Sequence, residues 1–452
     1  MRVLIQLRPA PDVVAAVADP GVTATTADVS DPLPGVVLDH SFVPVALPRP
    51  VPVAGGDPFS LSQSTTFSFA ADQASVMVRG EISDDELSTR LTLLPSMRSD
   101  VVGVHADPVI ESGLTCGGDA SVGDWHDVER LLRVTELQAE GLDGSGVALA
   151  VVDTGINAAH IIRHTGRSLT LDAQRSWKPD GVTGRPGEFP VDHGTMCAFD
   201  TLIAAPRTSL IDIPVLLSRR AGGSAMDGLL SDAVAAFAHL RTVLAAQPES
   251  SRSLIISNSW GSFSPRWDFP VGHPGNYSDN AAHPFNLIIS SLEQAGADVL
   301  FAAGNCGRDC QDRRCAYPDR PISGANSHSR VLSIGGVDTA GERVGYSSQG
   351  PGRLTSRKPD ICAYTHFSGS GAFGDGAPDS GTSAACPVAA GLVAAIRTRW
   401  PASRLSPAQL RALLRRTADD RGNFGFDYDY GYGVVDVSGV LASLRRREMR
   451  VA

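Results

Sequence analysis

Two hydrophobic patterns divide this chain. From about residue 125 onward, short apolar runs alternate with longer stretches whose apolar residues recur at helical spacing. Such alternation predicts a parallel β-sheet with helices on both faces. The expected strands are 147–152, 209–215, 253–258, 298–303 and 331–336, and the expected helices are 226–246, 281–295, 383–399 and 406–418.

Residues 1–115 show a different pattern. The expected strands there are 2–7, 36–47, 75–80 and 100–106, and the expected helices are 11–18 and 83–94. The second helix would begin at the capping box Ser83-Asp84-Asp85-Glu86. The resulting order, βαββαβ, is that of a ferredoxin-like domain. Residues 48–72 are rich in Pro, Gly, Ser and Thr and predict an insertion or flexible loop.

Length and composition add bounds to this picture. A chain of 452 residues exceeds the usual size of one domain, so we expect a domain of residues 1–115 with a linker to about 124, then a domain of residues 125–452. The net charge of −10 argues against non-specific nucleic-acid binding. No stretch approaches the ~20 apolar residues of a membrane span, and the N-terminal apolar run is too short for a signal peptide. We therefore expect a cytoplasmic protein without nucleic-acid or membrane partners, and the odd number of cysteines, seven, suits a reducing compartment.

Three distant segments carry candidate chemistry. Asp153 ends the apolar run 147–152, whereas His193 and Ser383 each stand just before a helix-like run. A serine hydroxyl is a poor nucleophile unless an imidazole takes its proton and a carboxylate orients that imidazole. The chain order Asp, His, Ser is one of three orders in which unrelated folds build this triad. Taken singly, each residue has a plainer reading: a loop carboxylate, a structural histidine at a helix start and a helix-capping serine.

At these segments the chain resembles the subtilisin-like serine proteases, the subtilases. The resemblance covers roughly residues 125–445 and rests on seven motifs in family order. They are Val151-Val152-Asp153-Thr154-Gly155, His193-Gly194-Thr195, Ser257-Asn258-Ser259-Trp260-Gly261, Ala302-Ala303-Gly304-Asn305, Lys358-Pro359-Asp360-Ile361, Gly381-Thr382-Ser383-Ala384-Ala385-Cys386-Pro387 and Gly431-Tyr432-Gly433-Val434-Val435-Asp436. The resemblance implies a subtilisin-like α/β peptidase domain. For residues 1–115 it implies a propeptide that aids the folding of the peptidase domain and inhibits it. An unrelated N-terminal binding domain is the alternative.

The resemblance also assigns site residues beyond the triad. It implies that the Asn305 side chain donates to the oxyanion, although a turn asparagine after glycine is the plainer reading. It implies substrate-binding roles for Ser259, Trp260, Gly261, Ala303 and Gly304, with the strand edge at 259–261 pairing to the substrate backbone. Trp260 could line a pocket or belong to the core.

The cysteines leave several readings open. Cys197 lies one helical turn after His193, where proteinase-K-like subtilases have a free cysteine, so sensitivity to thiol reagents competes with plain burial. Cys306, Cys310 and Cys315 follow the candidate oxyanion asparagine directly and depart from the usual family loop. They could form a disulfide, a zinc site completed by His273 or His328, or free thiols.

The sequence identifies no metal or cofactor site. Gly144-Ser145-Gly146 precedes its strand, which is the wrong order for a phosphate-binding loop. Structural calcium is frequent in subtilases, yet no aspartate-dense loop of fixed pattern marks a site. We therefore expect a cofactor-free serine endopeptidase that cleaves peptide or protein substrates and processes its own N-terminal domain. A catalytically silent scaffold of the same fold, and an esterase or transpeptidase using the same site, are the alternatives.

Overall fold

The computed structural model describes the chain from residue 1 to 449, apart from residues 20–21, 23, 31–32, 53–64, 88–90, 92–93, 95–97, 116–119 and 220–225. A central sheet of seven parallel strands has the order β10-β11-β9-β13-β14-β15-β16. The strands are β9 (Ala148–Val152), β10 (Thr170–Leu171), β11 (Ser209–Ile213), β13 (Leu254–Asn258), β14 (Ala297–Ala302), β15 (Leu332–Val337) and β16 (Ile361–Tyr364). The predicted α/β class is confirmed.

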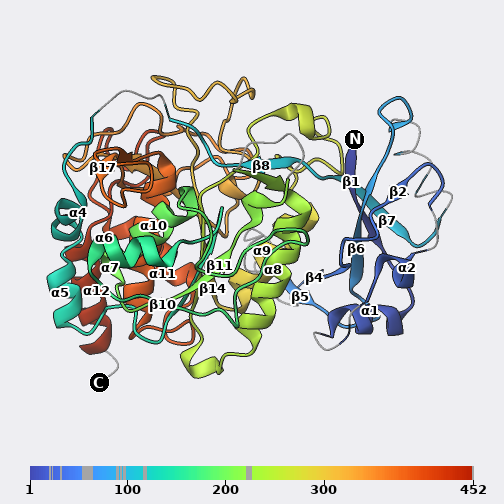
Figure 1. Ribbon diagram of the computed structural model, residues 1–452, viewed down its shortest axis with the longest axis horizontal. Helices are drawn as coiled ribbons and strands as arrows, with labels where there is room; N and C mark the ends of the chain where they lie inside the picture. The colour runs from blue at the N-terminus through green and yellow to red at the C-terminus, as the bar shows by residue number, and fades with distance from the viewer. Residues whose placement is uncertain are drawn as a thin grey trace.

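Helices cover both faces of this sheet (Figure 1). In β9, Leu149 and Val151 enter the core under α7 and α10, whereas Ala148, Ala150 and Val152 enter the core under α8 and α9. A strand whose successive side chains alternate between two buried faces must be apolar throughout, which explains its unbroken apolar run. The helices are α4 (Trp125–Leu131), α5 (Val134–Ala139), α6 (Ala158–Thr165), α7 (His193–Ala204), α8 (Leu230–Ala245), α9 (Pro284–Ala295), α10 (Thr382–Arg397), α11 (Pro407–Thr417) and α12 (Val437–Met449).

The N-terminal region forms a separate antiparallel sheet with the order β2-β6-β1-β7, and β3 also pairs with β6. The expected strand 36–47 is divided between β2 and β3, and residues 48–72, expected to be a loop, contain the hairpin β4-β5. Residues 88–90 and 92–93 of the expected helix 83–94 lie outside the described residues. The elements are β1 (Arg2–Leu7), α1 (Pro11–Ala18), α2 (Thr26–Val29), β2 (Val37–Leu38), β3 (Val45–Leu47), β4 (Arg49–Pro52), β5 (Thr65–Ser68), β6 (Ser75–Glu81) and β7 (Val101–Ala106).

This N-terminal sheet packs beside α8 and α9 (Figure 1). Leu4, Leu47 and Met77 share a buried core with these two helices. Directly after β7, the Asp107 carboxylate accepts from the Ser231 amide at 2.7 Å and from the Ser231 hydroxyl at 2.9 Å, which satisfies donors at the start of α8. The N-terminal region is thus joined to the peptidase domain by apolar packing and by a helix-capping carboxylate.

Two elements differ from the expected ones for local reasons. The strand expected over 209–215 ends at Ile213, because Pro214 lacks the amide that would continue the ladder. The helix expected over 226–246 begins only at Leu230, because residues Asp227–Leu229 form the strand β12 and pair with β8 (Val109–Glu111). Two short strands, β17 (Phe367–Ser368) and β18 (Pro378–Asp379), form a further pair.

Candidate active site

The carboxyl end of β9 positions a buried acid. Asp153 directly follows the strand, and its carboxylate accepts from His193 Nδ1, with distances of 2.8 Å to Oδ1 and 3.0 Å to Oδ2. A third contact, the Thr154 amide donating to Oδ1 at 2.7 Å, fixes the carboxylate further. Because a carboxylate can only accept, the histidine proton lies on Nδ1 and leaves Nε2 as an acceptor.

His193 is the first residue of α7, and Asp192 caps that helix. The helix start lies against the turn after Asp153, since a Cβ at Gly194 would be 2.5 Å from the Gly155 carbonyl oxygen. Only glycine fits there, and its amide donates to Thr154 Oγ1 at 2.8 Å. The glycine that follows the histidine in the sequence therefore permits the approach of the acid and the base.

Two opposing influences set the pKa of His193. Burial alone would lower the pKa of His193, but the Asp153 carboxylate outweighs burial and the pKa is raised above its usual value. Within the described residues, the buried Nε2 atom has no hydrogen-bond partner. The face of the ring that a reacting group would use is thus left open.

Ser383 lies in the first turn of α10 and is 2 % exposed. Its hydroxyl donates to the Ser259 carbonyl over a long 3.5 Å, while the Ser259 hydroxyl donates to the Ser383 carbonyl at 2.9 Å. The Cys197 sulfur lies 3.6 Å from Asp153 Oδ2, 3.7 Å from His193 Nδ1 and 3.5 Å from the Ser383 carbonyl oxygen. The three segments predicted to form the triad therefore meet around one buried thiol.

Asn305 is held with its amide nitrogen unused. Its Oδ1 accepts from the Thr382 amide at 2.9 Å and from Thr382 Oγ1 at 3.0 Å. Nδ2 is buried and has no partner among the described residues. A Cβ at Gly381, whose φ is +79°, would be 2.8 Å from Nδ2, so this residue both adopts a left-handed conformation and lies close to the amide. A buried donor without a partner costs free energy, and Nδ2 is free to donate to another group.

The linker after β7 runs through the cleft as an extended strand. Its residues Val109–Glu111 pair antiparallel with β12, and on the other side Glu111 and Gly261 exchange two backbone hydrogen bonds of 2.9 and 3.0 Å. Ser112 continues the contact by donating its amide to the Met226 carbonyl at 3.4 Å. The linker is therefore bound by β-augmentation on both edges, as a peptide substrate would be.

Beyond Ser112 the linker crosses the site itself. A Cβ at Gly113 would be 2.9 Å from Asn305 Nδ2, which places this residue at the unused amide. The Leu114 amide donates to Asp312 Oδ2 at 2.7 Å, and Thr115 Oγ1 lies 3.4 Å from Ser380 Oγ. Gly113 thus lies beside Asn305, one of the residues predicted to be catalytic.

The residues predicted to bind substrate make different kinds of contact in the structure. The backbone of Gly261 pairs with the linker, and Ser259 contacts Ser383. The Trp260 side chain, in contrast, is 1 % exposed and packs in the core, 4.9 Å from the Phe301 ring centroid, so it does not line a pocket.

The other two residues of that prediction are used within the fold. The Ala303 amide donates to the Ile334 carbonyl at 2.8 Å, and the Gly304 amide donates to Thr382 Oγ1 at 2.9 Å. They support Asn305 from below and offer no free amide to a substrate. Their predicted substrate-binding role stays a prediction.

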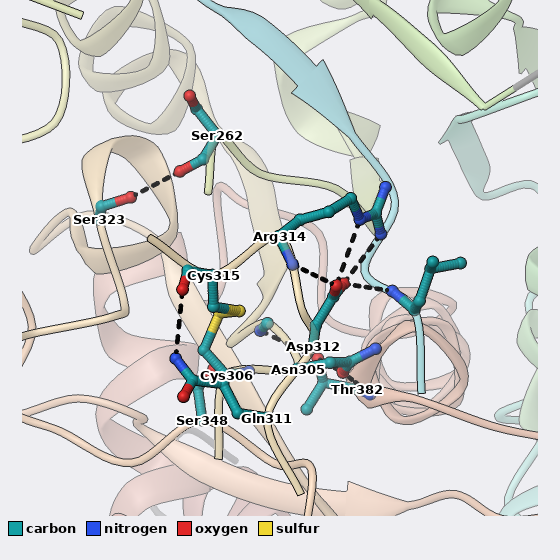
Figure 2. Close-up of a disulfide and its surroundings, with 12 residues drawn as sticks. Ser262, Asn305, Cys306, Gln311, Asp312, Arg314, Cys315, Ser323, Ser348 and Thr382 are labelled. Carbon is teal, nitrogen blue, oxygen red and sulfur yellow. Dashed lines mark hydrogen bonds and ion pairs between the residues drawn. A yellow bond between two sulfur atoms is a disulfide. The ribbon is translucent and has the colours of Figure 1, made fainter. Parts of the chain in front are cut away.

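The cysteine loop after Asn305 contains a disulfide between Cys306 and Cys315 (Figure 2). Cys310 is also disulfide-bonded, which excludes both the zinc reading and the free thiols. The free cysteines in the described part of the chain are Cys197, Cys362 and Cys386, all buried. Burial raises the pKa of Cys197 well above its usual value and keeps this thiol protonated.

A second buried charge cluster belongs to the scaffold. Lys358 and Asp360 are fully buried, with 2.7 Å between Nζ and Oδ2, and Arg415 Nε donates to the other carboxylate oxygen at 2.9 Å. Lys358 also donates to the Val331 carbonyl at 2.8 Å. These contacts join β16 to α11, so this sequence landmark is structural.

Within the described residues, the only group of three acidic, His or Cys side chains close enough to share a metal ion is Asp153, His193 and Cys197. The hydrogen bonds among these three side chains already account for their proximity. The described part of the chain has no helix that is both long and apolar enough for a membrane span.

A model of the subtilase family, peptidase S8, matches residues 144–433. The chain belongs to the subtilase family. It is similar to subtilisin DY of Bacillus licheniformis, with 25 % identity over 311 residues that cover 68 % of this chain and 95 % of that protein.

Other relatives agree in family. A calcium-dependent protease of Nostoc sp. is 28 % identical over 342 residues, covering 65 % of this chain and 46 % of that protein. Among solved structures, sphericase matches with a TM-score of 0.47 and 22 % identity, covering 65 % of this chain and 92 % of its own. The protein is a subtilisin-like serine endopeptidase that acts on peptide or protein substrates.

Sequence reasoning missed three residues at the cleft. Glu111 lies in the linker, and Asp312 and Arg314 lie in the cysteine loop, where they contact that linker (Figure 2). Nothing in the local sequence marks them. The unusual spacing of the cysteines was the only signal that this loop is special.

Proposed function

We propose that Ser383, His193 and Asp153 are the catalytic triad of this endopeptidase. Ser383 Oγ attacks the carbonyl carbon of the scissile bond, and His193 Nε2 takes the hydroxyl proton and later gives it to the leaving amine. Asp153 holds the Nδ1–H tautomer and stabilises the imidazolium. Water then hydrolyses the acyl-enzyme by the same steps.

Asn305 supplies the oxyanion donor in this proposal. The observation that carries it is the pair of buried, unused atoms, His193 Nε2 and Asn305 Nδ2, on a cleft through which an extended segment runs. These two atoms lie where a general base and an oxyanion donor are needed, and their position supports an active enzyme over the silent alternative.

Labelling with a fluorophosphonate tests the assignment. We expect one adduct on the wild-type protein, at Ser383, and none on Ser383→Ala or His193→Ala. Labelling of a different serine, or no labelling of a folded wild-type protein, would contradict the proposal. Hydrolysis of peptides by the labelled wild type would contradict it as well.

We further propose that residues 1–113 are a propeptide which the enzyme removes by cutting Gly113–Leu114. Support comes from the linker, which is paired on both sides like a substrate and brings Gly113 to Asn305. An intramolecular bond held in the site gains greatly from proximity. Before the cut, the same segment blocks the cleft, so the N-terminal domain would act as an inhibitor.

Two further expectations from the sequence concern the cellular compartment and structural calcium. Disulfides persist in oxidising compartments, so the Cys306–Cys315 bond favours such a compartment over the cytoplasmic location expected from the sequence. Structural calcium has no identified site here, and the name of the Nostoc relative makes it worth testing. A fall in melting temperature on adding EDTA would show a stabilising cation.

A further inference from the structure

The disulfide-closed loop contacts the linker on both sides of Gly113. On the amino-terminal side, Arg314 Nη1 donates to Glu111 Oε2 at 2.7 Å and Nη2 donates to the Ser112 carbonyl at 2.5 Å. On the carboxyl-terminal side, Asp312 Oδ2 accepts from the Leu114 amide at 2.7 Å. Figure 2 shows Asp312 and Arg314 side by side next to Asn305.

Arg314 is oriented before any substrate arrives. Asp312 Oδ1 accepts from the Arg314 amide at 2.9 Å, and Asp312 Oδ2 lies 2.9 Å from Arg314 Nη2. The Asp312 amide in turn donates to the Asn305 carbonyl at 3.0 Å, which couples the loop to the candidate oxyanion residue. The Cys306–Cys315 disulfide closes this loop, and the Cys306 amide donates to Ser348 Oγ at 2.9 Å. A guanidinium held in this way loses little entropy on binding a carboxylate.

The bonds of Arg314 divide into permanent and exchangeable ones. Asp312 belongs to the same loop and stays, whereas Glu111 and Ser112 belong to a linker that leaves the cleft once the chain is cut. The bond to the Ser112 carbonyl can be made by any peptide backbone. The bond to the Glu111 side chain cannot, because it requires an acceptor at that position.

The environment makes that bond selective. The Glu111 side chain is 7 % exposed and the Arg314 side chain 25 % exposed, so the ion pair is largely shielded from water. Burial raises the pKa of Glu111, and Arg314 opposes that rise. A neutral or cationic side chain at this place would leave the Arg314 Nη1 donor unmatched or face it with a like charge, which costs more in a shielded site than in water.

We propose that Arg314 makes this enzyme selective for substrates with an acidic residue at the third position before the scissile bond, the position that Glu111 occupies in the linker. This inference rests on the proposed function, since it takes the linker as the pattern of a bound substrate. The preference belongs to this chain's own loop, which departs from the family pattern noted in its sequence. The linker, which carries Glu111 at that position, then satisfies the substrate preference of the protease that it occupies.

The test uses fluorogenic peptides that copy residues 109–115, with Glu, Gln or Lys at the position of Glu111. For the wild-type protein we expect kcat/KM to be about tenfold higher for Glu than for Gln, and higher again than for Lys, as a charge-assisted hydrogen bond in a shielded site provides. Arg314→Glu should reverse the order and prefer Lys. The wild-type preference should shrink with rising salt.

Arg308→Glu is the matched control, because Arg308 lies on the same loop, has a 74 % exposed side chain and bonds Gln349 and not the linker. It should keep the preference for Glu. If Arg314→Glu fails to fold, Arg314→Gln provides the same comparison and should hydrolyse the Glu and Gln peptides equally. Equal rates for the three peptides with the wild type, or a preference for Glu that survives Arg314→Gln, would overturn the inference. A failure of the proposed function looks different: no peptide is cleaved and no fluorophosphonate adduct forms.

Discussion

The active-site groups and the linker that crosses them are held by different kinds of contact. Asp153, His193 and Asn305 are fixed by buried side-chain bonds that come from the ends of β9 and β14 and from the starts of α7 and α10. The linker is held by backbone pairing with Gly261 and β12 and by one ion pair to Arg314. The first set cannot exchange without unfolding, whereas every bond of the second set can be replaced by a bond to a substrate. Under the proposed function, the chemical groups belong to the core, and substrate recognition uses contacts that can be exchanged.

Among changes to the active-site groups, removal of the nucleophile should lower the catalytic rate most. We expect Ser383→Ala to lower kcat by about 10⁶-fold, the size of effect known for subtilisin, a relative of this protein. The fold should be intact, because Ser383 Oγ makes only one long hydrogen bond. The check is kcat on a peptide substrate together with the melting temperature. Turnover near the wild-type rate by the folded variant would remove Ser383 from the mechanism.

Removing the oxyanion donor should have a smaller effect. Asn305→Ala is expected to lower kcat by roughly 10²–10³-fold and to change KM much less, since the negative charge exists only beyond the ground state. Steady-state kinetics separate the two parameters. Thr382→Val is an informative companion, because it removes the hydroxyl that orients Asn305 Oδ1 and leaves Nδ2 in place. A large rise in KM with kcat unchanged for Asn305→Ala would indicate a structural or binding residue.

The junction between the N-terminal region and the rest of the chain should respond to pH. His105 and His283 lie at the junction of the two regions, with His283 Nε2 donating to the Ala106 carbonyl at 3.1 Å. Burial lowers the pKa of His105 to about 4 and that of His283 further below its usual value. A depressed histidine pKa means that the packed state binds fewer protons than the unpacked state. Its stabilising effect is therefore present above about pH 6.5 and is lost as the pH falls toward 4.

For His105 alone this shift corresponds to at most about 3 kcal/mol. Burial raises the pKa of the neighbouring Asp107 to about 6, which acts in the opposite direction by favouring the packed state at low pH. We expect the melting temperature of Ser383→Ala to fall between pH 6.5 and 4, and to fall less in a His105→Gln background. A melting temperature that rises on acidification would show that the buried carboxylates with raised pKa values, Asp107, Asp212 and Asp379, dominate over the histidines.

Substitution of Cys197, the thiol that lies among the three triad segments, should have the smallest effect on kcat/KM. Cys197 touches all three triad segments, yet burial keeps it protonated, so it has no chemical step to perform. We expect Cys197→Ala to change kcat/KM by less than about tenfold, mainly through the small cavity it leaves. N-ethylmaleimide should not inactivate the native enzyme at pH 7. Rapid inactivation would mean that the reagent reaches this thiol.

The sequence predicted those parts of the fold and site that have a local signature. Asp153 follows an apolar run, and His193 and Ser383 begin helices, so each could be placed from its own neighbours. The end of β11 at Pro214 and the strand β12 were missed for different reasons. Pro214 carries a local signal that the expected range overran, whereas β12 exists only because the distant linker pairs with it.

The other features that the sequence did not predict were missed because they depend on distant residues. The partner of Cys306, the core position of the Trp260 side chain and the contacts of Arg314 with Glu111 all depend on residues far away in the chain. No periodicity or motif encodes such contacts. For the same reason, the sequence could not predict that the amides of Ala303 and Gly304 donate to the Ile334 carbonyl and to Thr382 Oγ1.

The central claim is that the linker lies in the active site as a substrate, with Gly113–Leu114 as the scissile bond. Intact-mass measurement of the purified protein during incubation tests it most directly. The account predicts that the wild type loses residues 1–113 and gains an N-terminus at Leu114, while Ser383→Ala stays full length. A full-length wild type that already cleaves peptides would contradict both the cleavage and the inhibition, and a new N-terminus at any residue other than Leu114 would contradict Gly113–Leu114 as the scissile bond.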